Sequence, residues 1–159
     1  MTILVTGGAG FIASHTNVEL LDAGYDVIVM DNLCNSSKES VARVEQITGK
    51  KIRFYEADMR KVEELEPIFS ENAIDVIIHF AGLKAVGESC EKPYEYYENN
   101  ISGTLNIISM MKKYNVKKMV FSSSATVYGN PEVIPITEEC KVGGVTNPYG
   151  QTKLMLEQI

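Results

Sequence analysis

Apolar residues gather in five short runs along the chain, and segments with helical apolar spacing separate these runs. Within each run the apolar residues are continuous rather than alternating, which is typical of parallel strands that helices cover on both faces. The pattern therefore predicts an α/β fold with a doubly wound parallel sheet. The expected strands are Thr2–Thr6, Tyr25–Met30, Lys51–Tyr55, Asp75–Phe80 and Met119–Ser122.

Helices are expected where apolar residues recur at three- and four-residue spacing. Ser36 and Glu39 have the spacing of a capping box, and Asn147 before Pro148 is typical of an N-cap followed by the first helical residue. Pro67 is expected to kink or restart the helix around it. A long helix is expected to carry one apolar stripe of Tyr97, Ile101, Thr104, Leu105, Ile108 and Met111.

Composition and charge exclude several classes of function and leave the predicted fold unchanged. Lys and Arg total 15 against 21 Asp and Glu, and the net charge of −6 gives no overall attraction for nucleic acid. No apolar run approaches the roughly 20 residues that cross a membrane, so no membrane contact is expected. Scattered cysteines and two histidines, of which His79 is expected in the core, predict neither a disulfide framework nor a metal site. Reduced thiols and a start unlike a signal peptide predict a cytoplasmic protein.

A glycine-rich turn joins the first expected strand to the first expected helix. Its spacing fits both Gly8-x-Gly10-x-x-Ala13 and Gly7-x-x-Gly10-x-x-Ala13. Glycines allow a tight turn and a close approach of the backbone to a pyrophosphate, and the helix N-terminus supplies free N–H groups. A glycine turn without a ligand would have the same sequence, so this motif needs support from elsewhere in the chain.

Asp31 provides that support, because it ends the second expected strand about 20 residues further on. A carboxylate there accepts a hydrogen bond from the adenosine ribose 2′-OH and disfavours a 2′-phosphate. No arginine follows at positions 32–37. The sequence therefore predicts NAD rather than NADP as the cofactor.

Tyr149 and Lys153 lie four residues apart, on one face of the last expected helix. A free phenol has a pKa near 10, and a neighbouring cation lowers the pKa of such a group, so the pair can take a hydroxyl proton while a hydride leaves the same carbon. Ser124 follows the fifth expected strand, where a hydroxyl could hydrogen-bond the reacting oxygen. A surface pair on a helix or a serine capping a loop would look the same.

Taken together, the glycine turn, Asp31, Ser124 and Tyr149-x-x-x-Lys153 resemble the extended short-chain dehydrogenase/reductase family through all 159 residues. Three segments are similar, more narrowly, to its UDP-glucose 4-epimerase (UDP-galactose 4-epimerase) branch. These segments are Asp31–Ser36, His79–Ser89 and Ser122–Gly129. The resemblance implies NAD-dependent interconversion of UDP-glucose and UDP-galactose by oxidation at C4, turnover of a 4-keto sugar and return of the hydride to its other face.

The resemblance also implies roles for individual residues. Tyr149 would be the catalytic base, Lys153 its partner and Ser124 a hydrogen-bonding aid. The residues expected to bind NAD are Gly7, Gly10, Phe11, Ile12, Asp31, Asn32, Asn35, Ser36, Asp58, Met59, Phe80, Ala81, Gly82, Lys84, Asn99, Tyr149 and Lys153. The residues expected to bind the sugar nucleotide are Lys84, Ala85, Val86, Ser124 and Tyr149.

Three positions separate the chain from relatives within this family. Ala13 stands where the family usually has glycine, which is expected to affect cofactor packing only slightly. Ala125 and Thr126 stand where the sugar-nucleotide 4,6-dehydratases carry an acidic pair, so oxidation and reduction at C4 alone is favoured. An epimerase of an N-acetylhexosamine or uronic acid nucleotide, or an NAD-binding module without catalysis, remains an alternative.

Length limits what the chain is expected to do. Five strands are fewer than the six of a full dinucleotide-binding sheet, and the family resemblance implies a chain about twice as long. We therefore expect residues 1–159 to be an incomplete, truncated NAD-binding domain of the Rossmann-like type, with the C-terminal substrate domain absent. This part alone is expected to bind NAD weakly and to be inactive, whereas the complete protein is expected to be a homodimer.

Overall fold

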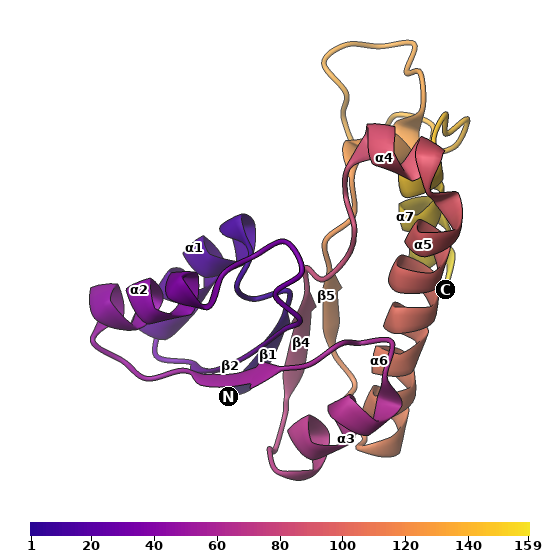
Figure 1. Cartoon of the computed structure of the whole chain (residues 1–159). Helices are drawn as coiled ribbons and strands as arrows, with labels where there is room; N and C mark the ends of the chain where they lie inside the picture. The colour runs from indigo at the N-terminus through magenta and orange to yellow at the C-terminus, as the bar shows by residue number, and fades with distance from the viewer. The chain divides into compact units, whose positions relative to one another are not determined.

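The computed structural model describes residues 1–159, which form two compact units. Unit 1 consists of Met1–Ala81 and Leu105–Ser122, and unit 2 consists of Gly82–Thr104 and Ser123–Ile159. All strands of the structure belong to unit 1, and unit 2 is built from helical segments and loops (Figure 1).

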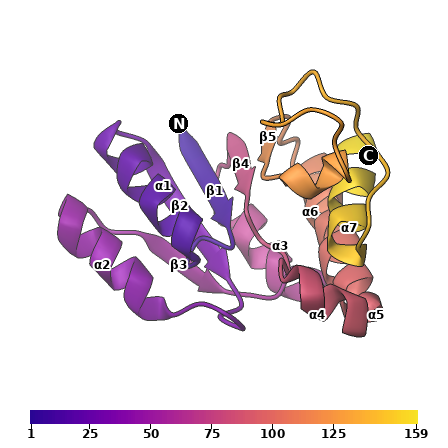
Figure 2. The same ribbon diagram turned by 90° about the horizontal axis from the view of Figure 1, so that it is seen from above.

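Unit 1 contains one parallel sheet. Its strands are β1 (Thr2–Thr6), β2 (Asp26–Asp31), β3 (Arg53–Glu56), β4 (Val76–His79) and β5 (Met119–Phe121). They lie in the order β3-β2-β1-β4-β5 (Figure 2). The order changes direction between β1 and β4, and the carboxyl ends of the strands at such a switch point are where open α/β sheets bind ligands. The predicted doubly wound, Rossmann-like sheet is confirmed.

Helices cover both faces of this sheet (Figure 1). They are α1 (Phe11–Asp22), α2 (Lys38–Thr48), α3 (Val62–Ser70) and α6 (Gly103–Lys113), of which α6 belongs to unit 1 from Leu105 onward. Ile3 and Val5 of β1 pack in the core with residues of α1 and α2, whereas Leu4 packs in the core with residues of α3 and α6. Because successive side chains of a strand point to opposite faces, a strand between two cores must be apolar throughout.

The last residue of β4, His79, is fully buried, and its Nδ1 lies 2.6 Å from the Thr6 hydroxyl oxygen of β1. The expectation of a core histidine is confirmed. The hydrogen bond satisfies a ring nitrogen that burial would otherwise leave without a partner.

Unit 2 is arranged around its last helix. Its elements are α4 (Val86–Glu91), α5 (Pro93–Tyr97), the π-helical segment η1 (Glu98–Ser102), the short 3-10 helix η2 (Ala125–Tyr128) and α7 (Pro148–Gln158). The elements α4, α5, η1 and η2 all contact α7. The side chains at the start of α7 are therefore surrounded by the rest of the unit.

The long predicted helix departs from expectation at its π-helical turn. The chain is helical from Pro93 to Lys113, but Glu98–Ser102 has the wider π hydrogen bonding. Such a turn contains an extra residue, so one 3.6-residue stripe cannot continue through it. Leu105 of the predicted stripe is 43% exposed, while Ile107 and Met110 are buried, so that part of the prediction was wrong.

Two helix boundaries also differ from those predicted. The side chain that caps α2 belongs to Ser37, whose Oγ accepts a hydrogen bond of 3.3 Å from the Glu39 backbone N–H. Ser36 is not the cap, because its hydroxyl donates to Asp31 instead. α3 does not restart at Pro67 but runs through it.

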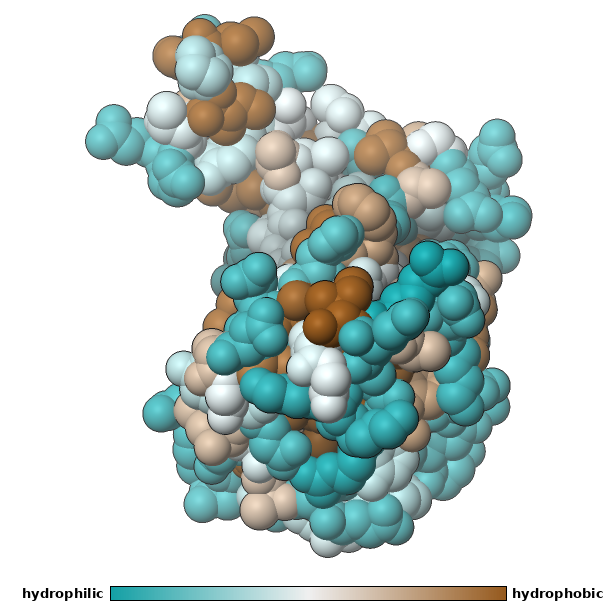
Figure 3. Space-filling model, turned by 90° about the vertical axis from the view of Figure 1, so that its left-hand side faces the viewer, coloured by the Kyte–Doolittle hydropathy of each residue, from teal (hydrophilic) through white to brown (hydrophobic).

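None of the helices is long and apolar enough to cross a lipid bilayer. The face drawn in Figure 3 is mostly hydrophilic, with separate apolar patches. Exposed apolar side chains also occur in the loop between η2 and α7, at Val133, Ile134 and Ile136.

Replacing Gly49 by alanine should lower the free energy of unfolding by about 1 kcal/mol. Gly49 ends α2 with a φ of +67°, and a Cβ there would meet no atom within 4 Å, so the cost comes from the backbone conformation alone. Urea unfolding measures this change. Gly49→Asn is the control, because asparagine adopts this conformation more easily and should cost less; equal losses for the two variants would contradict the explanation.

Candidate functional site

The turn between β1 and α1 brings the backbone of unit 1 close to the end of β4. Gly7 has a φ of +66°, and a Cβ there would lie 2.7 Å from the Ala81 backbone nitrogen. Gly10 is the N-cap of α1 and supplies no side chain to its first N–H groups. Because these N–H groups have no acceptor within the helix, the turn forms a positively polarised site that suits a phosphate.

The third glycine position of this motif holds Ala13, which is buried in the core that α1 and α2 share with the sheet. Its methyl group is accommodated there, so α1 packs closely on the sheet with alanine at this position. Two apolar side chains at the start of α1 remain exposed, Phe11 at 76% and Ile12 at 58%.

Asp31 joins the glycine turn to the loop after β2. Its Oδ2 accepts a hydrogen bond of 3.0 Å from the Ala9 N–H, and its Oδ1 accepts bonds of 2.9 Å from the Leu33 N–H and 2.8 Å from the Ser36 hydroxyl. A carboxylate has about four acceptor positions, so one remains on Oδ2. The group is thus held in place and can still accept one hydrogen bond from a ribose hydroxyl.

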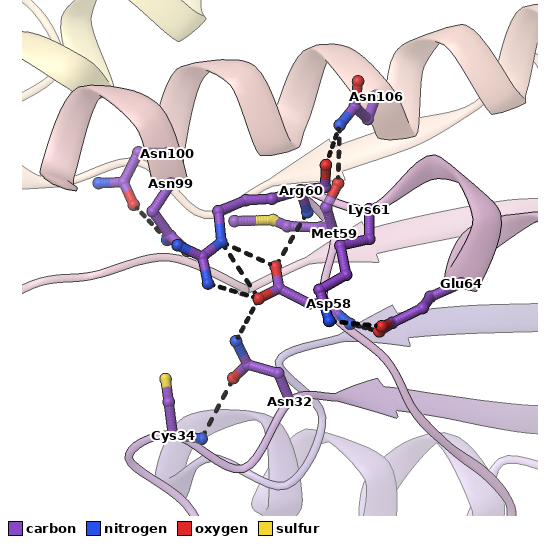
Figure 4. Close-up of polar contacts among 10 residues, drawn as sticks. All are labelled: Asn32, Cys34, Asp58, Met59, Arg60, Lys61, Glu64, Asn99, Asn100 and Asn106. Carbon is purple, nitrogen blue, oxygen red and sulfur yellow. Dashed lines mark hydrogen bonds and ion pairs between the residues drawn. The ribbon is translucent and has the colours of Figure 1, made fainter.

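A second buried carboxylate, Asp58, follows β3 (Figure 4). Arg60 binds both of its oxygens, with Nη2 2.6 Å from Oδ2 and Nε 3.0 Å from Oδ1, and the Asn32 side chain donates at 3.5 Å. Hydrogen bonding from the Arg60 side chain is the main reason that the pKa of Asp58 falls to about 2. Asp58 is therefore charged at neutral pH. The adjoining Met59 is buried, and its carbonyl accepts from the Asn106 side chain at 3.0 Å.

The first two turns of α7 hold the predicted proton-transfer pair of unit 2. The Asn147 side chain caps the helix by accepting a hydrogen bond of 2.8 Å from the Gly150 N–H. Tyr149 is 9% exposed and Lys153 is 5% exposed. Burial lowers the pKa of the Lys153 ammonium from 10.5 to about 8, so it stays largely protonated at neutral pH.

Ser124 lies at the start of η2, where it is the N-cap. Its Oγ accepts hydrogen bonds from two donors of Thr126, the backbone N–H at 3.2 Å and the hydroxyl at 2.9 Å. A Cβ placed on Gly150 would lie 3.0 Å from the Thr126 hydroxyl oxygen. The absence of a side chain at Gly150 thus lets η2 pack against the turn that carries Tyr149.

Asn100 connects the segment after Ala81 to α7. It exchanges two hydrogen bonds with the Leu83 backbone, accepting from the N–H at 2.8 Å and donating to the carbonyl at 2.9 Å. It also donates to the Thr152 hydroxyl at 3.0 Å and accepts from the Asn99 side chain at 3.0 Å. Sequence reasoning missed this residue, although a polar pair inside a helical apolar stripe is a signal that could have found it.

Tyr96 fixes the next part of the same segment. Its buried hydroxyl accepts a hydrogen bond of 3.0 Å from the Ala85 N–H and donates one of 2.9 Å to Glu88. The predicted sugar-nucleotide residues Lys84, Ala85 and Val86 are exposed. Their backbone is therefore held while their side chains remain accessible.

The predicted residues thus fall into two sets. The set in unit 1 is Gly7, Gly10, Phe11, Ile12, Asp31, Asn32, Asn35, Ser36, Asp58, Met59, Phe80 and Ala81. The set in unit 2 is Gly82, Lys84, Ala85, Val86, Asn99, Ser124, Tyr149 and Lys153. Asn35 is exposed. Most of the predicted NAD-binding residues therefore lie in unit 1, whereas unit 2 carries the remaining ones together with the predicted proton-transfer and sugar-nucleotide residues.

Comparisons with known proteins identify the family of the chain. Over 159 residues the chain is 65% identical to the UDP-glucose 4-epimerase of Pasteurella multocida (strain Pm70) and 62% identical to that of Bacillus subtilis (strain 168). Each alignment covers 100% of this chain and 47% of the relative, so the chain spans about half the length of the curated relatives it matches.

Solved structures give the same result. A crystal structure of UDP-glucose 4-epimerase from Bifidobacterium longum, in complex with NAD+ and UDP, matches with 61% identity and a TM-score of 0.97, covering 99% of this chain and 47% of that one. The model of the NAD dependent epimerase/dehydratase family matches residues 3–159. This chain is therefore a member of the NAD dependent epimerase/dehydratase family.

Proposed function

We propose that the complete protein interconverts UDP-glucose and UDP-galactose with NAD as its cofactor, and that residues 1–159 are its cofactor-binding part. The observation that carries the proposal is the buried pair of Tyr149 and Lys153 at the start of α7, in a chain 65% identical to a UDP-glucose 4-epimerase. The interconversion needs a proton to leave the C4 hydroxyl oxygen and a hydride to leave C4, and both to return. The transfer of the proton is the task that this pair can perform.

The residues of unit 1 fit NAD. The close approach of Gly7 to Ala81 leaves room only for backbone at the turn, and the start of α1 offers N–H groups to a pyrophosphate. Asp31 keeps one acceptor position, which suits a ribose hydroxyl and not a 2′-phosphate. NAD, when bound, supplies the acceptor and donor for the hydride at C4.

The residues of unit 2 would handle the proton. Tyr149 takes the proton of the C4 hydroxyl and returns it, and its partner is the buried Lys153 on the same face of α7. Ser124 donates a hydrogen bond to the C4 oxygen. Lys84, Ala85 and Val86 would contact the sugar nucleotide, supported by their exposure on a backbone that Tyr96 and Asn100 hold.

The same residues argue against the dehydratase reaction in the family description. Elimination of water from the sugar requires protons to move at two further atoms, which calls for additional acid and base groups. Ala125 and Thr126, directly after Ser124, provide no carboxylate. Simple oxidation and reduction at C4 is therefore the favoured reaction.

Three finer features belong to the proposal as predictions. Residues 1–159 alone should bind NAD weakly and turn over no substrate, which the coverage of only 47% of the relatives supports. The complete protein should be a homodimer. Its predicted place is the cytoplasm, supported by three cysteines that form no disulfide.

Replacing Tyr149 by phenylalanine in the complete protein should reduce the conversion of UDP-galactose to UDP-glucose by about 100-fold or more, because the proton acceptor is lost. Chromatography of the nucleotide sugars measures the rate, and NAD released on denaturation measures the cofactor, which should remain bound. Tyr94→Phe is the matched control, since Tyr94 is 72% exposed and its loss should change neither quantity. An inactive unaltered protein would refute the proposed function, and an active Tyr149→Phe variant would refute the assignment of the base.

Replacing Asp31 by asparagine should weaken NAD binding by about tenfold, because the ribose loses a hydrogen bond to a charged acceptor. The preference for NAD over NADP should also fall. Equilibrium titration with both dinucleotides measures these changes. Asp22→Asn, the same change at an exposed position near the end of α1, is the control. Equal affinities of unaltered protein and Asp31→Asn for NAD would contradict the prediction.

Stability should depend on the titration of Lys153. Its pKa is about 8 in the folded protein and 10.5 when free, so the folded state binds fewer protons between these pH values. Stability should therefore rise with pH through this window, by up to about 3 kcal/mol, and the penalty is fully present below pH 8. Comparing urea unfolding at pH 7.5 and 10 for the unaltered protein and Lys153→Met isolates this effect. The same slope in both proteins would contradict the prediction.

A further inference from the structure

The hydrogen bonds at Ser124 determine which role its hydroxyl can play. The Oγ of Ser124 accepts from the Thr126 N–H at 3.2 Å and from the Thr126 hydroxyl at 2.9 Å. A serine hydroxyl has one hydrogen to donate and two lone pairs to accept with. Both acceptor positions are therefore filled from the same residue, and the hydrogen of Ser124 is left to point away from Thr126.

An ordinary cap of a short helix explains only the first of these bonds. In such a cap the serine oxygen accepts a backbone N–H, and the hydroxyl can still rotate and accept a second partner. Here the side chain of Thr126 adds the second bond. The chain of two hydroxyls also polarises the outer one, which strengthens the hydrogen bond that Ser124 donates.

Thr126 is itself held in position by its surroundings in unit 2. Gly150 leaves space for it, because a Cβ on that glycine would lie 3.0 Å from the Thr126 oxygen and 3.1 Å from its Cβ. The turn is closed by hydrogen bonds from Val127 N–H to the Ser124 carbonyl at 3.1 Å and from Gly129 N–H to the Thr126 carbonyl at 3.2 Å. The hydroxyl of Thr126 is thus directed at Ser124 by packing and backbone together.

A hydroxyl fixed as a donor suits one state of the substrate better than the other. The C4 hydroxyl of the sugar can donate or accept, whereas a C4 alkoxide or ketone oxygen can only accept. A donor that needs no reorientation binds the oxygen most strongly as negative charge develops on it, and this difference accelerates the reaction. The arrangement therefore favours the transition state over bound substrate.

We propose that Thr126 is a positioning residue that fixes the Ser124 hydroxyl as a hydrogen-bond donor to the C4 oxygen. This inference rests on the proposed function. In this scheme Thr126 acts on the C4 oxygen through Ser124.

The test uses the complete protein with Thr126→Val, which removes the hydroxyl and keeps the shape of the side chain. The kcat for UDP-galactose should fall by roughly three- to tenfold, the effect of one ordinary hydrogen bond, and KM should change less than twofold. Thr126→Ser keeps the hydroxyl and should retain a kcat within twofold of the unaltered protein. Thr126→Cys, with a weaker donor of similar size, should lie between the two.

A double-mutant cycle separates this role from a structural one. In a Ser124→Ala background, Thr126→Val should cause no further loss of kcat, because the residue through which it acts is absent. An equal loss in that background, an unchanged kcat in Thr126→Val, or a failure of Thr126→Ser to restore activity would each overturn the inference. If Thr126→Val has a much lower melting temperature than the unaltered protein, the kcat values of Thr126→Ser and Thr126→Cys test the inference instead. The serine variant should then have the higher kcat of the two.

The activity of the unaltered protein distinguishes a failure of the proposed function from a failure of this inference. Without interconversion of UDP-galactose and UDP-glucose, the proposed function and the inference both fall. If the unaltered protein interconverts the two sugars normally and Thr126→Val leaves kcat unchanged, the inference alone is refuted and the proposed function stands.

Discussion

Unit 1 depends above all on the hydrogen bonds that the carboxylate of Asp31 accepts. Asp31 ends a central strand, and its three hydrogen bonds hold the glycine turn on one side and the loop after β2 on the other. Without it, the Ala9 and Leu33 N–H groups would lose a charged acceptor, and Ser36 would lose its partner. One side chain thereby shapes the turn for a pyrophosphate and presents an acceptor to the neighbouring ribose.

Unit 2 is subject to a different constraint, because the Lys153 cation and the Tyr149 phenol are both buried near the start of α7. Burial alone disfavours the charged form of Lys153, as its lowered pKa shows. The start of α7 is nevertheless kept in position by Asn147, and Asn100 ties the same helix to the segment around Leu83. These bonds join neutral groups, so the framework is insensitive to pH although Lys153 within it titrates.

The strands could be predicted because their cause is local. β1 lies between two cores, so Ile3, Leu4 and Val5 must all be apolar, and this pattern is visible in the sequence. The glycine turn and Asp31 were visible for a similar reason, since spacing along the chain carries the geometry. The exposure of Leu105 was not foreseen, because the π-helical turn that shifts the stripe is stabilised by contacts elsewhere. Asn100 was missed as a site residue for the same reason, because its partner Thr152 lies 52 residues further along the chain.

The neighbouring serines at the start of α2 illustrate how small the local signal can be. Ser36 and Ser37 are equally good caps by composition, yet Ser37 caps the helix and Ser36 binds Asp31. Only the position of the carboxylate at the end of β2 decides between them. A sequence pattern specifies which chemical groups are available, and the three-dimensional surroundings determine which partner each group binds.

The π-helical turn at Glu98–Ser102 has a consequence for how the family can vary in length. Deleting one residue there would restore a regular α-helix, which is locally the more stable form. The same deletion would rotate Asn100 by about 100°, the angle per residue of an α-helix, and its hydrogen bonds to Leu83 and Thr152 would be lost. This stretch should therefore keep its length in homologous proteins, while insertions and deletions collect in the exposed loop between η2 and α7.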